Sequence, residues 1–164
     1  MLEVTLAALA AFPDQLERHY AEFPAGREDW KPTSWEGIPS ESLSAREQVC
    51  HVRDIEIDGY QVRFRRLLTE TRPTLASLDT YALVQERNYA GANLKEMFAQ
   101  FRAARRETLQ MLGNLSEQQL ARPGHFDDYG EVTLRSMIHY LCSHDQQHLA
   151  GLQWLLGQVA SIPR

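Results

Sequence analysis

Apolar side chains recur at three- and four-residue steps along most of this chain, a spacing that places them on one face of an α-helix. Alternation of apolar and polar residues, which is typical of half-buried strands, is scarce. The pattern predicts four long amphipathic helices, over residues 2–23, 44–72, 93–112 and 134–157. Pro13 interrupts the first of them, because a proline inside a helix removes one hydrogen bond and crowds the preceding turn.

The limits of these helices follow from residues that satisfy free backbone groups or end a helix. Ser44 and Glu47 form a capping box, in which each side chain hydrogen-bonds the free backbone N–H of the other residue. Thr133 is the predicted N-cap of the last helix. Pro73 cannot extend the second helix, and Gly157 is predicted to end the fourth.

Three stretches between the helices lack helical periodicity. Residues 24–42 are polar and contain Pro and Trp, residues 71–92 form a long connection, and residues 122–130 are predicted to be loop after a short helical turn at 116–120. Four helices of about 20 residues, each roughly 30 Å long, pack most economically as an all-α four-helix bundle. We therefore predict one such domain over residues 1–164, with long crossover connections.

Composition narrows the class of protein without identifying a function. The chain has 43% hydrophobic and 24% charged residues and a net charge of −5, from 17 basic and 22 acidic residues. This balance is typical of a globular domain and argues against a broad nucleic-acid surface. No stretch is long enough to span a membrane, and the apolar start carries Glu3 and no basic lead, which argues against a signal peptide. Cys50 and Cys142 are too few for a disulfide framework, which favours the cytoplasm.

The last predicted helix places two histidines on its apolar face. This face consists of residues three or four positions apart: Met137, Leu141, His144, His148, Leu152 and Leu155. Buried imidazoles are costly unless their ring nitrogens find partners. His144 and His148 lie one turn apart, so one metal ion can contact both rings at about 2.0–2.1 Å. The alternative is that the spacing is incidental and the rings belong to the core.

His51 is a third candidate ligand, on the second helix. It lies seven residues after Ser44, or about 10 Å along the helix, and His148 lies nine residues before Gly157, or about 14 Å. These levels nearly coincide if the two helices are antiparallel. Three neutral imidazoles leave a fourth position open, which is the pattern of catalytic metal sites. An ion there can lower the pKa of a bound water to about 7 or stabilise a thiolate.

Two carboxylates near these histidines are candidate catalytic residues. Asp54 follows His51 by one turn and Asp145 adjoins His144, so each can orient a ligand imidazole or act as a base. The alternative for Asp145 is a solvated carboxylate. Six arginines form two clusters that either bind an anionic substrate or, as is commoner, lie on solvated faces: Arg63, Arg65, Arg66, Arg102, Arg105 and Arg106.

Three segments resemble the DinB/YfiT-like family in order and separation, namely residues 44–56, 86–91 and 132–149. The first histidine of the family corresponds to His51, and its closing His-x-x-x-His to His144 and His148. The resemblance implies an up-down-down-up bundle, often dimeric, that holds nickel, zinc or iron on these three histidines. Residues 30–42 depart from the family's usual short Gly-Lys-Trp-Ser lead-in.

The resemblance also implies an activity. We expect a metal-dependent enzyme that acts on a small-molecule substrate, either as an S-transferase that uses a low-molecular-weight thiol or as a hydrolase. The alternative is a non-catalytic metal-binding homodimer that acts in stress response or ligand binding. Imidazole suits zinc, nickel, copper and iron alike, so the residues do not choose the metal. Neither a nucleic acid nor a membrane is expected as a partner.

Overall fold

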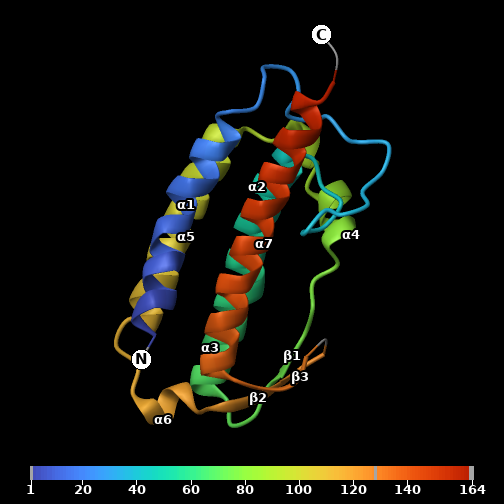
Figure 1. Cartoon of the computed structure of the whole chain (residues 1–164). Coiled ribbons are helices and arrows are strands. Elements are labelled where there is room, and N and C mark those ends of the chain that lie inside the picture. Colours follow the sequence, from blue (N-terminus) through green and yellow to red (C-terminus); the bar gives the residue numbers. More distant parts are fainter. Residues whose placement is uncertain (1, 128, 163–164) are drawn as a thin grey trace.

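The computed structural model describes residues 2–127 and 129–162. Four long helical rods lie side by side in it (Figure 1). The rods are α1 (Glu3–Tyr20), the continuous run of α2 (Ala45–Asp54), η1 (Ile55–Tyr60) and α3 (Gln61–Thr69), then α5 (Leu94–Leu112) and α7 (Leu134–Ala160). Shorter helices lie in the connections: α4 (Thr80–Glu86), η2 (Tyr89–Gly91) and α6 (Glu117–Leu120).

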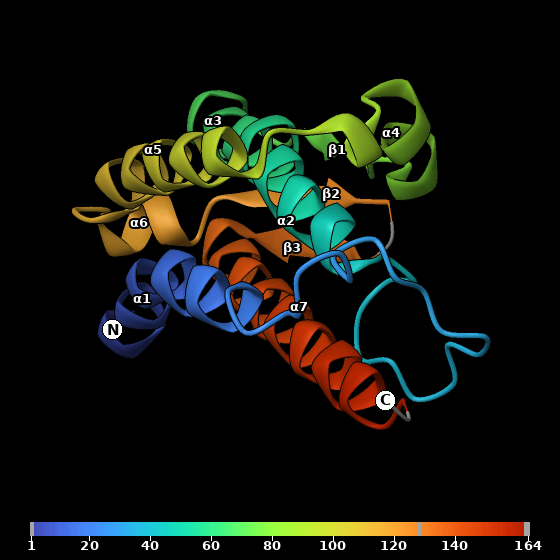
Figure 2. The ribbon, with the colours of Figure 1, turned by 90° about the horizontal axis from the view of Figure 1, so that it is seen from above.

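The four rods run up, down, down and up in chain order (Figure 1). α1 packs against α5 and α7, and α2 packs against the same two helices, so α1 and α2 occupy diagonal corners (Figure 2). The predicted all-α bundle and its up-down-down-up topology are confirmed. α2 and α7 are consequently antiparallel neighbours, which is the arrangement that brings the predicted histidines to one level.

Helix ends follow the predicted capping residues closely. Ser44 and Glu47 form the capping box of α2, and the hydroxyl of Thr133 accepts a hydrogen bond from the backbone N–H of Ser136 at the start of α7. α1 ends at Tyr20, and α7 continues one turn beyond the predicted stop, to Ala160. Every helix among the described residues is too short or too polar to cross a membrane.

Pro13 lies inside α1 without interrupting it, which corrects the prediction. A proline has no N–H, so the carbonyl of residue 9, four positions earlier, loses its helical partner. The guanidinium of Arg105 replaces that partner, because its Nη1 donates to the Leu9 carbonyl oxygen at 2.8 Å. Both Leu9 and Pro13 are buried, so packing against α5 and α7 holds the helix continuous.

The second rod contains a π-helical segment that periodicity did not predict. Residues 55–60 form η1 between α2 and α3. A π turn holds one more residue than an α turn, so the faces before and after it are offset. Glu56 is buried within this segment and contributes to the polar interior described below. π-helical segments often mark functional sites.

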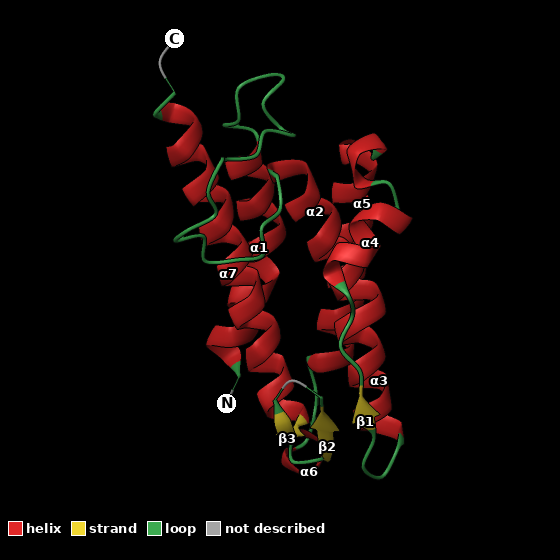
Figure 3. Cartoon of the chain, turned by 90° about the vertical axis from the view of Figure 1, so that its right-hand side faces the viewer, coloured by secondary structure: helices red, strands yellow, loops and turns green. Residues whose placement is uncertain are grey.

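A small three-stranded sheet covers the end of the bundle where α7 begins (Figure 3). Its strands are β1 (Thr74–Leu75), β2 (Pro123–Phe126) and β3 (Gly130–Thr133), with β1 parallel and β3 antiparallel to the central β2. The prediction of loop over residues 122–130 was wrong for residues 123–126 and for residue 130, which lie in strands. Strands of two to four residues are too short to show a period of two, so the sequence carries no signal for them.

Among the described residues, the two larger apolar clusters of the interior lie on either side of a polar layer. Leu141 belongs to one cluster and Leu152 to the other, and on α7 His144, Asp145 and His148 lie between them. The layer continues on the other rods: His51 and Glu56 on the second rod, and Arg105 on α5, are buried. Polar groups inside a bundle require partners, so this layer is where function is to be sought.

Candidate metal centre

The three predicted histidines meet inside the bundle. The Nε2 atom of His144 lies 3.2 Å from Nε2 of His51 and 3.1 Å from Nε2 of His148. His51 and His148 are buried, and His144 is partly exposed with a buried Nδ1 atom. The antiparallel packing of α2 against α7 therefore places three imidazole nitrogens of the same kind around one point.

A fourth group, the carboxylate of Glu41, completes this cluster. Its Oε2 lies 3.1 Å from Nε2 of His148 and its Oε1 lies 3.7 Å from Nε2 of His51. All four candidate ligand atoms lie within 4.8 Å of one another. Sequence reasoning missed Glu41 because its segment has no helical periodicity. The available signal was that residues 30–42 depart from the family's usual lead-in.

The cluster has the chemistry of a site for a divalent transition-metal ion. Burial lowers the pKa of His51 to about 3 and that of His144 well below its usual value, so both imidazoles are neutral. The Nδ1 atoms of these two rings have no hydrogen-bond partner among the described residues. Neutral imidazoles whose Nε2 atoms converge cannot all satisfy one another, whereas one cation accepts a lone pair from each. A tetrahedral ion with bonds of about 2.0–2.1 Å separates its ligand atoms by about 3.3–3.4 Å, close to the distances observed.

The charge of Glu41 suits the same site. Burial alone raises the pKa of Glu41, but the close approach of its oxygens to the His148 and His51 rings outweighs burial and lowers the pKa to about 2. The group is therefore a carboxylate at neutral pH. An anionic oxygen beside three neutral nitrogens gives a donor set that zinc, nickel and iron all accept.

Gln48 fixes the orientation of one of these rings. The N–H at Nδ1 of His148 donates to Oε1 of Gln48, which leaves Nε2 as the acceptor that faces the cluster. Gln48 is fully buried, and its Nε2 donates to Oγ of Ser40 at 2.8 Å. Ligand histidines usually have such a partner behind the ring. Gln48 lies one turn before His51 on the same helix, a signal that sequence reasoning left unused.

A small cavity opens beside the histidines. Its volume is about 130 Å³, and it is bordered by Glu41, His51 and His144. The rest of its wall comes from the second rod, the segment before α4 and the β2–β3 hairpin: Ile55, Tyr60, Arg63, Ser77, Leu78, Thr80, Phe126 and Tyr129. One side of the cluster therefore faces a pocket and not the packed core.

Comparison with known proteins agrees with this picture. A sequence model of the DinB superfamily matches residues 3–152, which is most of the chain. The chain belongs to the DinB superfamily. The structure superposes with a TM-score of 0.83 on YfiT from Bacillus subtilis, described as a probable metal-dependent hydrolase with an unusual four-helix bundle topology. That match covers 96% of this chain and 87% of YfiT at 19% identity, so it establishes a shared fold. No curated protein sequence matches the chain.

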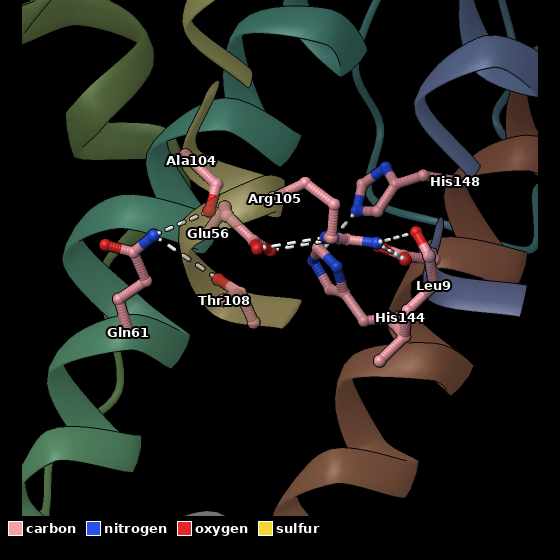
Figure 4. Close-up of polar contacts among 9 residues, drawn as sticks. Leu9, Glu56, Gln61, Ala104, Arg105, Thr108, His144 and His148 are labelled. Atoms are coloured by element: carbon pink, nitrogen blue, oxygen red, sulfur yellow. Dashed lines mark hydrogen bonds and ion pairs between the residues drawn. The ribbon is translucent and has the colours of Figure 1, made fainter. Parts of the chain in front are cut away.

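In this member of the DinB superfamily, Asp145 belongs to a second polar cluster. Arg105 donates to its two carboxylate oxygens at 2.6 and 3.0 Å and to both oxygens of Glu56 at 2.9 Å. Figure 4 shows the Arg105 side chain with Glu56 and Leu9, close to the rings of His144 and His148. Burial raises the pKa of Asp145, and the Arg105 guanidinium opposes that shift.

Two predictions about the exposure of charged side chains were wrong. Arg105 is 2% exposed and Arg63 is also buried, so neither lies on a solvated face. Asp145 is likewise buried and is not a solvated carboxylate. The local charge pattern could not reveal this, because the partners of Arg105 lie 40 and 49 residues away along the chain.

Asp54 connects α2 to residues 71–92, the crossover segment between α3 and α5. Its Oδ2 accepts a hydrogen bond from the Tyr89 hydroxyl at 2.6 Å, and its Oδ1 lies 2.9 Å from both Nε of Arg53 and Nη1 of Arg87. Neither Asp54 nor Asp145 belongs to the group of four candidate ligands. Cys50, which neighbours His51, packs with Leu83 and Tyr89, and burial raises the pKa of its thiol to about 12.

Proposed function

We propose that this chain is a metal-dependent hydrolase of a small substrate, in which His51, His144 and His148 hold one divalent zinc, nickel or iron ion. The observation that carries the proposal is the convergence of three Nε2 atoms beside an open cavity, with that of His144 lying 3.2 and 3.1 Å from those of His51 and His148. A structural site would be closed on all sides by protein, whereas catalytic sites keep one side accessible. The likeness in fold to YfiT supports the same class of chemistry.

The side chains around the ion hold it and fix the orientation of its ligands. When bound, the ion lowers the pKa of a water ligand to about 7 or stabilises a thiolate. Neutral imidazoles leave the full positive charge of the ion available, and Gln48 holds the His148 ring in one tautomer. We propose that Asp54 and Asp145 position the helices and ligands, because arginines and Tyr89 already engage both carboxylates.

The volume of the cavity favours hydrolysis over transfer from a thiol. About 130 Å³ admits a group of few atoms, whereas pockets for larger ligands measure about 300–1,000 Å³. A thiol cofactor and an electrophile together need more room than a small ester and one water. Thiol transfer remains the second candidate, and a cytoplasmic homodimer remains a prediction from the sequence.

The test combines metal analysis with a substrate panel. Protein purified without added metal, and protein reloaded with zinc, nickel or iron, is offered small esters, amides and phosphoesters, and then model electrophiles with a low-molecular-weight thiol. His148→Ala should abolish both metal retention and turnover. His139→Ala is the matched control, because His139 lies on α7 but its Nδ1 contacts Thr5 at the surface.

Each result has a defined meaning. Hydrolysis by the loaded wild type and by His139→Ala, but not by His148→Ala, supports the proposal. Metal binding without turnover on any substrate favours the non-catalytic bundle. Equal activity of His148→Ala and wild type excludes chemistry at this centre.

A further inference from the structure

We infer that Glu41 is a displaceable fourth ligand of the metal centre, carried on a loop that Gly151 allows to lie against α7. The inference rests on the proposed ion at the three histidines and adds how that ion is covered and uncovered. The loop is residues 24–43, which form most of the connection between α1 and α2 and place Glu41 in the cluster. A substrate then enters by taking the place of the Glu41 carboxylate.

Glu41 occupies the side of the cluster that the histidines leave open. Its two oxygens lie 3.1 and 3.7 Å from the nearest Nε2 atoms, which brackets the separation expected between ligands of one tetrahedral ion. Its side chain is 34% exposed, whereas those of His51 and His148 are 1% and 0% exposed. Glu41 also borders the cavity. It therefore stands between the ion position and the pocket, on a loop and not on a helix.

The position of Glu41 depends on a close contact between its neighbour Ser40 and α7. A Cβ atom added to Gly151 would strike Oγ of Ser40, and it would lie 2.9 Å from Cβ of Ser40 and 3.2 Å from Nε2 of Gln48. Any residue larger than glycine at position 151 would thus push the loop away from the helix. A glycine inside a helix costs about 1 kcal/mol relative to alanine, so close approach of the loop is a sufficient reason for it.

Two further contacts attach the loop beside the centre. Nε2 of Gln48 donates to Oγ of Ser40, so one amide side chain contacts both the loop and the His148 ring. One turn beyond Gly151, the Trp154 ring stacks on Trp35 at a centroid distance of 6.3 Å. The loop is consequently docked on α7 along the same face that carries His144 and His148.

Displacement of Glu41 changes the charge that a substrate meets. Three imidazoles and one carboxylate leave a net charge of +1 around a divalent ion, and removal of the carboxylate leaves +2. Small anions should therefore bind the ion more tightly when Glu41 is absent or moved. A carboxylate that only lines the pocket also repels anions, so the metal affinity and the cobalt absorption bands are the readouts that separate a fourth ligand from such a group.

The experiment uses cobalt(II) as a spectroscopic probe in the full chain. Glu41→Gln and Gly151→Ala should each weaken cobalt affinity by about tenfold or more, alter the cobalt absorption bands, and tighten acetate binding. Gly157→Ala is the matched control, since it lies on α7 and an added Cβ there meets nothing within 4 Å. That variant should keep the wild-type spectrum and affinity.

A double variant keeps the test independent of folding defects. Ser40→Gly removes the Ser40 atoms that a methyl group added at position 151 would strike, but it also removes the hydrogen bond from Gln48. Ser40→Gly combined with Gly151→Ala should therefore match the affinity of Ser40→Gly alone and exceed that of Gly151→Ala alone. Wild-type spectra, metal affinity and acetate affinity in both Glu41→Gln and Gly151→Ala would overturn the inference while leaving the three-histidine centre in place. Unchanged cobalt binding in His148→Ala would instead overturn the proposed function.

Discussion

The polar layer of the bundle contains two clusters that satisfy their buried groups in different ways. In the first, the Arg105 guanidinium is paired with the carboxylates of Glu56 and Asp145 and with the Leu9 carbonyl. In the second, three histidines direct the same kind of atom toward one point, and two of their Nδ1 atoms find no partner among the described residues. The arginine cluster is complete within the protein, and the histidine cluster needs a cation.

This difference separates a part that stabilises the fold from a part that serves function. An ion pair already formed in the interior is strongly destabilising to break from one side. Neutral ring nitrogens without partners contribute little to the stability of the metal-free fold. They stabilise the protein only when a metal ion binds to them. Substitutions in the two clusters should therefore have opposite effects on stability and on metal binding.

The largest expected effect is the loss of Arg105. Arg105→Met removes the positive partner of two buried carboxylates and the donor to the carbonyl beneath Pro13. We expect the free energy of unfolding of the metal-free protein to fall by about 3–5 kcal/mol, the range for a buried ion pair broken on one side. Urea denaturation followed by circular dichroism measures it.

Arg102 provides the comparison for that variant. It lies one turn before Arg105 on α5 and pairs with Asp14 and Glu17, which are far more exposed. Arg102→Met should cause a much smaller loss, because water and salt screen exposed pairs. Equal losses in the two variants would mean that the buried cluster is no more important to the fold than a surface pair.

His144→Leu should reverse this behaviour. In the metal-free protein the substitution removes a ring whose Nδ1 atom has no partner among the described residues, so the free energy of unfolding should stay the same or rise. With zinc at about 100 times its dissociation constant, the wild type should gain about 2.7 kcal/mol and the variant nothing. Paired melts with and without zinc check this. A large loss of stability in metal-free His144→Leu would show that the rings already satisfy one another.

The same contrast explains what the sequence could predict. The histidines were predictable because they interrupt an apolar stripe at helical spacing, and the bundle was predictable from four such stripes. Glu41 was not, because its position depends on a loop docked through Gly151, and loop docking leaves no periodic trace. The arginine cluster was hidden for a similar reason, since its three charged side chains come from three different rods.

Gln48 tests how strongly the ligand rings depend on their surroundings. Gln48→Leu removes the acceptor for Nδ1 of His148 and should weaken metal affinity by about 10–100-fold, as loss of a partner behind a ligand does. Gln48→Glu keeps an acceptor at that atom and should recover most of the affinity. Isothermal titration with zinc measures both. Similar affinities for Gln48→Leu and wild type would contradict the assigned role.

The smallest expected effect is the loss of the hydrogen bond from Tyr89 to Asp54, which tests whether Asp54 acts by positioning. Tyr89→Phe removes the hydroxyl that donates to Oδ2 and keeps the ring, while Arg53 and Arg87 still face Oδ1. We expect unfolding to become easier by about 1 kcal/mol, with metal affinity unchanged. If Asp54 positions the crossover segment, Asp54→Asn should lower the free energy of unfolding and leave turnover close to that of the wild type. A loss of turnover in Asp54→Asn at unchanged stability and metal content would assign the carboxylate to the reaction instead, because a purely positional group acts through the fold.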